Sequence, residues 1–473
     1  MPRWKVTGAL ARAALATLVA GCGGLADDDA TPGTFLDETV EVLLADVVAL
    51  PASERPFARY LLLTQLDDSA ASWDASVLGE RTREATERAI ERRLVRERVG
   101  ASKLANSLSN APQIARPEPI ADGLVLRIDI RDYGWDRSLQ VADSLHSDGW
   151  SAISAAAALG VELTGPDADQ LKALTHTAIP FLFAHDFVTT AVSGDLYYDL
   201  LDLPPTLNQL KQQLDARMAE APASGTSGYR AGFTTSTFST NIRAVERRFS
   251  SDNQAFGYWQ AFDFRDDERG SAVFSEPLTF EPDGTEVLFQ LPNGLHGYYV
   301  ANAAGHRLTE GYQSAVTSSN RSAADCFGCH DDGVLSFQDQ VRSRFMSSAA
   351  TAGFSEADRA SVLAVYPETG RLDRMRDSAN ERYAAALAQA GREGVLTEPV
   401  REISAGFDAN VVPELAAQEL FVDPDELGAV LPELSPTHPV ERGRQNRERY
   451  LERYWDSLCQ LQRQARNPPL GCR

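Results

Sequence analysis

The pentapeptide Cys326-Phe327-Gly328-Cys329-His330 constrains this chain more than any other feature of its sequence. Two cysteines separated by two residues lie on one turn of a helix, and a histidine follows the second directly. This Cys-x-x-Cys-His pattern is typical of haem c attachment, in which both thiols bond to one haem and the histidine binds its iron. The chain has a single such motif. It predicts one covalently attached haem c, held by Cys326 and Cys329, with His330 as the proximal iron ligand.

Paired cysteines also occur in zinc sites and in redox dithiols. A structural zinc site needs further ligands at matching spacing, and the sequence has neither a second Cys-x-x-Cys pair nor a His-x-x-x-His pair. A thioredoxin-like dithiol needs a βαβ context, which the sequence after the motif does not provide. The pattern therefore favours haem attachment over both alternatives.

The first 21 residues have the features of a bacterial signal peptide. Basic residues precede an apolar run at 13–20, which is much shorter than the roughly 20 residues of a membrane-spanning helix. Small residues then lead into Cys22, as in the lipobox of bacterial lipoproteins. We expect residues 1–21 to be removed, Cys22 to carry lipid and residues 22–34 to form a flexible tether. A plain secretory signal or an uncleaved anchor is the alternative.

Lipidation at Cys22 would place the protein in the cell envelope, anchored to the inner or outer membrane and facing the periplasm or the surface. This compartment is oxidising, so it favours disulfides between cysteines that the haem does not use. Cys459 and Cys472 are the remaining pair, and the sequence NPPLG between them can turn the chain back on itself. We predict a disulfide between them, which would stabilise the protein by about 2–4 kcal/mol.

The chain is strongly acidic. Its 45 Lys and Arg residues against 67 Asp and Glu residues give a formal net charge of −22 at pH 7. Such a surface repels phosphate backbones, so we expect no nucleic-acid partner. It favours instead a redox partner protein with a basic docking patch. A length of 473 residues also exceeds what one hydrophobic core usually organises, so more than one domain is expected.

The periodicity of apolar residues predicts an α+β N-terminal region followed by an all-α cytochrome c-like haem domain. The first region spans residues 35–315; it is predicted to be helical to about residue 225 and strand-rich over 228–311. The haem domain spans residues 316–473 and includes a C-terminal extension, because helical patterns follow one another there.

Several segments carry clear local signals. Residues 81–104 have charged residues at helical spacing, and residues 124–130 alternate in the manner of a strand. The stretch from residue 131 to residue 145 is predicted to be helical. Ser355 and Asp358 resemble a capping box, which predicts a helix beginning there.

The sequence leaves the second axial ligand of the iron open. Met346 and Met375 follow His330 at spacings compatible with a small cytochrome c domain. The ligand could instead be a histidine from elsewhere in the chain, namely His185, His296 or His438. The remaining possibility is an open position on the iron. A methionine ligand would raise the reduction potential and suit electron transfer, whereas an open position would permit peroxide or small-gas chemistry.

Charged residues that follow the motif have two interpretations. Arg342 and Arg344 could pair with the haem carboxylates, or they could belong to a solvated helix face. Asp331 and Asp332 are predicted to form an exposed acidic rim. Two histidines of the N-terminal region, His176 and His185, lie in an apolar stretch. They are more typical of buried structural histidines than of iron ligands.

Several strings resemble a group of large, mostly uncharacterised bacterial envelope proteins that carry one Cys-x-x-Cys-His motif near the end of a long sequence. In chain order they are RYL at 59–61, NSLS at 106–109, RIDIRDYGW at 127–135, RAGF at 230–233, ER at 246–247, GYW at 257–259, LPNGL at 291–295 and residues 326–342. The resemblance covers most of residues 55–345 and implies a cytochrome c-like envelope protein of the respiratory kind. Its members tend to carry Gly-Met after the motif, where this chain has Gly333-Val334.

Together these features predict a lipid-anchored monohaem c-type cytochrome that transfers electrons in the bacterial cell envelope. One alternative is a haem enzyme, peroxidase-like or oxidase-like, with an open iron site. Another is a haem-bearing binding or sensor lipoprotein. The motifs of nucleotide-binding and common hydrolase chemistry do not occur in the sequence.

Overall fold

The computed structural model describes most of the chain between residues 33 and 407. The described residues are 33–63, 80–141, 143–159, 163–218, 226–235, 241–250, 257–308, 323–347, 353–392 and 397–407, with short pieces at 410–411, 416–417, 419, 427–429 and 445–446. Cys22, Cys459, Cys472 and His438 lie outside the described residues, as do the signal peptide and nearly all of the tether. The lipid anchor and the disulfide therefore stay predictions.

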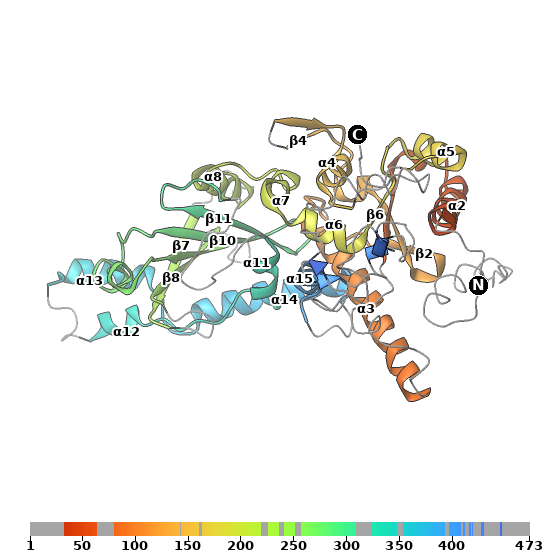
Figure 1. The fold of residues 1–473 in the computed structure, drawn as a ribbon. Helices are drawn as coiled ribbons and strands as arrows, with labels where there is room; N and C mark the ends of the chain where they lie inside the picture. The colour runs from red at the N-terminus through yellow and green to blue at the C-terminus, as the bar shows by residue number, and fades with distance from the viewer. Residues whose placement is uncertain are drawn as a thin grey trace, which may run out of the picture.

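Helices and strands are interspersed along the described chain (Figure 1). The α-helices are α2 (Gly33–Ala49), α3 (Glu80–Ser107), α4 (Gly149–Ala156), α5 (Pro166–Thr175), α6 (Ala184–Ala191), α7 (Gly194–Leu200), α8 (Leu207–Met218), α9 (Asp267–Gly270), α10 (Ala272–Ser275), α11 (Ala323–Cys329), α12 (Val341–Met346), α13 (Glu356–Val365), α14 (Arg371–Gln389) and α15 (Pro399–Phe407). The strands are β1 (Ala58–Leu62), β2 (Glu118–Ile120), β3 (Val125–Asp129), β4 (Leu139–Val141), β5 (Ser144–His146), β6 (Phe181–Phe183), β7 (Thr226–Phe233), β8 (Arg243–Ser250), β9 (Gly257–Asp263), β10 (Gly284–Gln290), β11 (His296–Asn302), β12 (Asn410–Val411) and β13 (Gln445–Asn446). Short 3-10 turns cover Arg55–Phe57, Ala121–Gly123 and Ile130–Tyr133.

A four-stranded sheet organises the N-terminal part, in the order β2-β3-β1-β6. Strand β1 pairs with β3 in the antiparallel sense and with β6 in the parallel sense. Alternate residues of β1 face opposite sides: Tyr60 packs in one apolar cluster with Leu43 of α2 and Leu171 of α5. Leu61 packs in a second cluster with Leu104 of α3. Helices therefore cover both faces of this sheet, and all five β1 residues are buried.

A five-stranded antiparallel sheet forms the other half, in the order β11-β10-β9-β8-β7. Its register places Tyr298, Leu288 and Trp259 side by side on one face, which we call the cavity face. The opposite face carries Phe262, which packs in one apolar cluster with Val341 of α12. Helices α12 and α13 lie at one end of the molecule and α2 and α5 at the other (Figure 1).

The predicted fold class is wrong. The chain is mixed α/β, with strands spread along its length, and it is not an α+β region followed by an all-α domain. Besides the expected strand β3, the strands β1, β2, β4, β5 and β6 lie in the stretch expected to be mainly helical. In the stretch expected to be all-α, β12 pairs with β13. The physical reason is length: β1 and β6 are short apolar runs buried on both faces, and periodicity cannot separate such runs from a buried helix.

The helix expected over residues 131–145 is also absent. A 3-10 turn over Ile130–Tyr133 ends at Gly134, which has a left-handed backbone (φ 69°), and β4 and β5 then form a two-stranded hairpin. The expected strand at 124–130 is confirmed by β3, and the helix at 81–104 by α3. The capping box is confirmed as well: the Ser355 side chain accepts from the Asp358 backbone, and the Asp358 side chain accepts in return.

Helix α11, which carries the Cys-x-x-Cys-His motif, has no separate helical core. Its Phe327 is fully buried and meets the rings of Tyr197 from α7 and Tyr298 from β11, with centroid distances of 6.5 and 5.1 Å. Both partners come from the N-terminal side of the chain. The motif is thus built into the same apolar cluster as the two sheets. Among the described helices, none is long and apolar enough to cross a membrane.

We predict that Phe327→Ala lowers the free energy of unfolding of the haem-free protein by about 3–5 kcal/mol, because it empties a fully buried aromatic site. Chemical denaturation of protein made without haem attachment measures this. Leu145→Ala is the control, since Leu145 is 73% exposed and its loss should change stability by less than about 0.5 kcal/mol. A loss below about 1 kcal/mol for Phe327→Ala would show that α11 is not part of the shared core.

Candidate haem site

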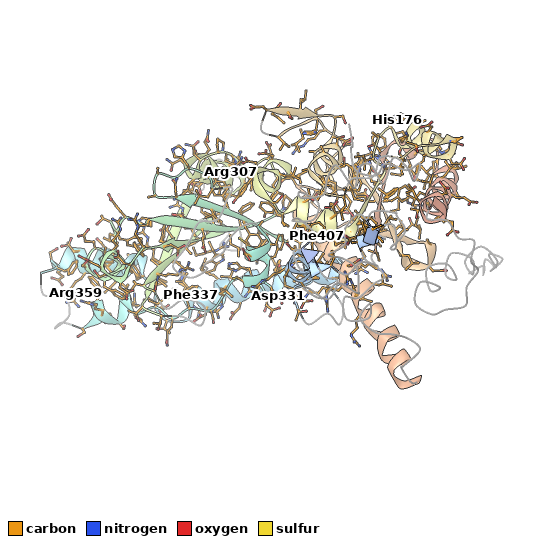
Figure 2. The ribbon with its side chains drawn as sticks, in the orientation of Figure 1. His176, Arg307, Asp331, Phe337, Arg359 and Phe407 are labelled. Carbon is orange, nitrogen blue, oxygen red and sulfur yellow. The ribbon has the colours of Figure 1, made fainter. Side chains whose placement is uncertain are left out.

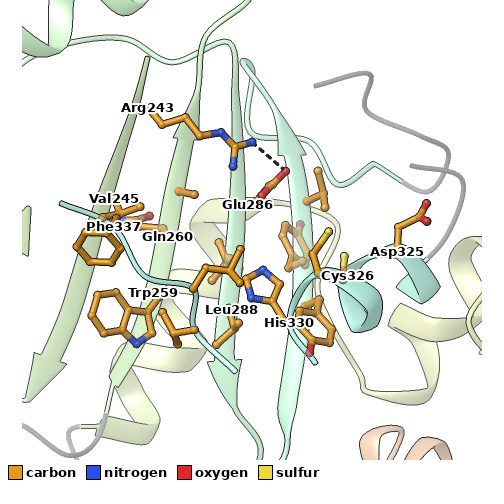
Figure 3. Close-up of a pocket in the computed structure, with 18 of the residues that line it drawn as sticks. Arg243, Val245, Trp259, Gln260, Glu286, Leu288, Asp325, Cys326, His330 and Phe337 are labelled. Carbon is orange, nitrogen blue, oxygen red and sulfur yellow. Dashed lines mark ion pairs between the residues drawn. The ribbon is translucent and has the colours of Figure 1, made fainter. Parts of the chain in front are cut away.

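Helix α11 brings the three residues of the motif to one cavity. The His330 backbone N–H donates to the Cys326 carbonyl at 2.9 Å, so the histidine continues the last helical turn. Cys326, Cys329 and His330 all line the same open cavity, where the space between atoms, solvent at its opening included, amounts to about 1200 Å³. Figure 3 shows the imidazole in front of the cavity face, with Cys326 beside it. The predicted haem ligands are therefore brought together.

The walls of the cavity are mostly apolar. The sheet contributes Trp259, Leu288 and Tyr298 from its cavity face. The segment after the motif contributes Val334 and Phe337, so the chain that follows α11 forms part of the cavity wall. The Phe337 ring lies at an angle of 65° to the Trp259 ring, with centroids 5.9 Å apart. A large apolar cavity with a few polar groups is what a cofactor site requires.

The orientation of His330 is set by one hydrogen bond. Its Nδ1 lies 2.9 Å from the Gly333 carbonyl oxygen, which can only accept, so Nδ1 carries the proton. Nε2 is then left with a free lone pair, which is the state in which a histidine binds iron. Burial lowers the pKa of His330, which favours the same neutral form. The Tyr298 ring stacks beside the imidazole at 5.7 Å between centroids.

Asn380 of α14 holds the turn that positions this carbonyl. Its Nδ2 donates to the Val334 carbonyl at 3.0 Å, and its Oδ1 accepts from the Val334 backbone N–H at 2.7 Å. Gly333 has a left-handed backbone (φ +104°), and a Cβ there would overlap Asn380 Oδ1. Only glycine satisfies both conditions. The turn from His330 to Val334 is therefore pinned by a side chain that lies 46 residues further along the chain.

Both thiols are half-buried and unbridged. Burial raises the pKa of Cys326 and of Cys329, so both stay protonated at neutral pH. Redox-active dithiols depend on the opposite shift, in which a positive environment lowers the pKa and exposes a thiolate. In the described part of the chain, no three His, Cys, Asp or Glu side chains converge on a position that could hold a metal ion.

The cavity also contains charged residues that the sequence reasoning missed. Arg243 and Glu286 line it, and Arg243 Nη2 lies 3.6 Å from Glu286 Oε1 (Figure 3). Asp263 is buried and forms a second ion pair with Arg243. The indication of this group in the sequence is Glu286, a single charged residue within a strand pattern. Its partners could not be inferred, because Arg243 and Asp263 belong to two other strands.

Neither proposed methionine ligand lines the cavity. Met346 is 60% exposed on α12, which packs against the opposite face of the sheet. Met375 is buried in α14, in the large apolar cluster. Among the described cavity residues, His330 is the only histidine, and none is a methionine.

The other histidines that were considered have different surroundings. His185 Nε2 lies 3.1 Å from Glu419 Oε1, and its ring stacks on Phe183. His296 is buried and stacks on Tyr383 with ring centroids 4.1 Å apart. His176 ends α5 with a left-handed backbone, far from the cavity residue Phe337 (Figure 2). None of these three lines the cavity.

The charged residues after the motif are likewise used elsewhere. Arg342 Nη1 donates to the carbonyls of Leu363 and Tyr366, at 3.1 and 2.6 Å, and does not line the cavity. The Arg344 guanidinium lies over the Phe274 ring at 5.7 Å. Asp331 and Asp332 form ion pairs with the guanidinium of Arg392, which itself is mostly buried.

The described residues therefore fit a covalently attached haem: two thiols and an imidazole with a free Nε2 line one open, mostly apolar cavity. Comparison with known proteins adds no identification, because no family model, curated protein or solved structure matches this chain. What the site can do rests on its own geometry.

We predict that Gly333→Ala destabilises the haem-free protein by about 2–4 kcal/mol, since it adds a clash with Asn380 to the cost of a left-handed alanine. Gly391→Ala is the matched control: its φ is +101°, but no atom lies within 4 Å of the added Cβ. That variant should lose only about 1–2 kcal/mol. Chemical denaturation compares the two. Equal losses would mean that the contact with Asn380 does not hold the turn.

Proposed function

We propose that this protein is a monohaem c-type cytochrome of the bacterial cell envelope, anchored by lipid at Cys22, that transfers electrons to or from a partner protein. The observation that carries the proposal is the cavity in which Cys326, Cys329 and His330 meet. A chance Cys-x-x-Cys-His string would not be expected to line an open, mostly apolar cavity with its histidine in the neutral, Nδ1-protonated form.

Each residue of the motif would have a defined task. Cys326 and Cys329 would form the thioether bonds, and His330 Nε2 would bind the iron. The carbonyl of Gly333 would keep the imidazole in the required tautomer. When bound, the haem supplies one-electron chemistry, and the apolar walls from Trp259 and Phe337 would tune its potential by excluding water.

The proposed location and the proposed partner are supported by the sequence. The signal sequence and Cys22 support export and lipid anchoring, which would also meet the requirement for haem attachment outside the cytoplasm. The net charge of −22 supports docking to a basic patch. Asp332 is 95% exposed and lies two residues after His330, so negative charge is present near the cavity.

We predict that protein matured in a host with cytochrome c assembly carries one haem, and that the double variant Cys326→Ala/Cys329→Ala carries none. Intact mass and a pyridine haemochrome spectrum measure this. Cys459→Ala/Cys472→Ala is the control, which should keep the haem because those cysteines lie outside the motif. Wild-type protein without added mass, or a haem that persists in the motif variant, would refute the proposal.

A second function is favoured by a specific observation. No described residue of the cavity other than His330 is a histidine or a methionine, whereas Arg243 and Glu286 provide polar groups inside it. A haem held there by His330 alone would have an open position for a small ligand. This supports the alternative of a haem enzyme or sensor that binds a small molecule.

Carbon monoxide discriminates the two functions. If the second axial position is open, the reduced protein will bind carbon monoxide rapidly, with a shift of its main absorption band. The same titration on an electron carrier with two strong protein ligands would give no shift. Variants Met375→Leu and Met346→Leu test the methionines directly, and unchanged spectra in both would exclude each as a ligand.

A further inference from the structure

Arg243, Glu286 and Asp263 are an unusual group to bury in a cavity with apolar walls. Side-chain exposure is 15% for Arg243, 28% for Glu286 and 4% for Asp263. Removing charged groups from water costs several kcal/mol per ion unless they are paired. Apolar residues at these strand positions would have filled the same space at lower cost. The presence of these charges would be explained if they interact with a ligand that the cavity holds.

The buried carboxyl group of Asp263 does not fully neutralise Arg243. Burial, and then the neighbouring Glu286 carboxylate, raise the pKa of Asp263 to about 8. At neutral pH Asp263 is consequently largely protonated and contributes little negative charge. It therefore neutralises only a small part of the positive charge of Arg243. The guanidinium can accept a further anion.

The Arg243 guanidinium also has an N–H group that no described residue uses as a hydrogen-bond donor. A guanidinium carries five N–H groups. Within the described residues, its Nη2 contacts the carboxyl groups of Asp263 and Glu286, and its Nε, which is buried, has no hydrogen-bond partner. The two acids come from neighbouring strands, β9 and β10, so they hold the guanidinium firmly at the cavity wall.

We propose that Arg243, held in place by Asp263 and Glu286, is the anion-binding residue of this cavity and takes a small group with anionic oxygen. This inference rests on the proposed haem site. Two sources offer the same chemistry: a free oxyanion such as nitrite or formate, or a carboxylate of the haem itself. In either case the planar guanidinium donates hydrogen bonds to the oxygen atoms.

The experiment compares wild-type haem-loaded protein with Arg243→Leu and Arg243→Lys. Arg248→Leu is the matched control: Arg248 lies on the same strand, also pairs with carboxylates (Asp215 and Glu246), but belongs to the opposite face of the sheet. Intact mass first confirms equal haem loading. Nitrite and formate are then titrated into the oxidised protein by absorption, and carbon monoxide, a neutral ligand, into the reduced protein. Resonance Raman spectra report the hydrogen bonding of the haem carboxylates.

Two results would support the proposal and identify the source. A free anion is the ligand if Arg243→Leu weakens nitrite and formate binding at least tenfold, Arg243→Lys weakens it less, and carbon monoxide affinity changes less than twofold. A haem carboxylate is the ligand if anion affinity is unchanged but the carboxylate bands shift in Arg243→Leu and not in Arg248→Leu.

The proposal fails if haem-loaded Arg243→Leu matches wild type in both measurements. Haem-free wild-type protein is a different result, because it refutes the proposed function itself. If Arg243→Leu does not fold, two other single variants provide the test. Glu286→Gln keeps the shape of the site, and Arg243→Lys keeps its positive charge. The proposal would also be overturned if Arg243→Leu and the control Arg248→Leu lost anion affinity to the same extent.

Discussion

The packing of Phe327 against Tyr197 and Tyr298 is the interaction on which the rest of the structure depends. It joins α11 to α7 through Tyr197, which precedes Phe327 by more than one hundred residues. It also joins α11 to β11 through Tyr298, which precedes Phe327 by about thirty residues. Because Phe327 lies between the two motif cysteines, burying its ring turns both thiols and His330 toward the cavity face of the second sheet. The same contact that stabilises the fold therefore places the proposed haem ligands.

A second constraint acts on the turn that follows. The Gly333 carbonyl orients His330, and Asn380 of α14 holds the next residue through two hydrogen bonds. The proposed iron ligand is thus fixed from both sides, by α11 before it and by α14 after it. The chain then continues over the cavity as Phe337 and bonds to the edge strand β7, where the Gly232 backbone N–H donates to Asp339 at 2.8 Å. Motif, turn and cavity wall form one unit with the sheet.

Local signals in the sequence predicted local structure well. Charges at helical spacing led to α3, alternation led to β3, and Ser355 with Asp358 led to the capped start of α13. One local prediction was wrong, because a 3-10 turn and the β4–β5 hairpin replace the helix expected over residues 131–145. The other wrong predictions concern contacts between distant segments. Strands β1 and β6 have no alternation because both faces are covered, so their pairing partners decide their state. The expectation of a separate all-α haem domain was wrong for the same reason: α11 has its apolar partners in the other half of the chain.

By itself, the sequence determined which groups can bond to a haem: two thiols one helical turn apart and an adjacent imidazole, a relation set by the geometry of five consecutive residues. Only the tertiary structure decided what surrounds them. The cavity face, the charged group around Arg243 and the positions of Met346 and Met375 away from the cavity depend on strands and helices brought together from distant parts of the chain. Such contacts form because burying apolar surface is favourable wherever complementary faces meet, and a linear pattern does not specify which faces will meet.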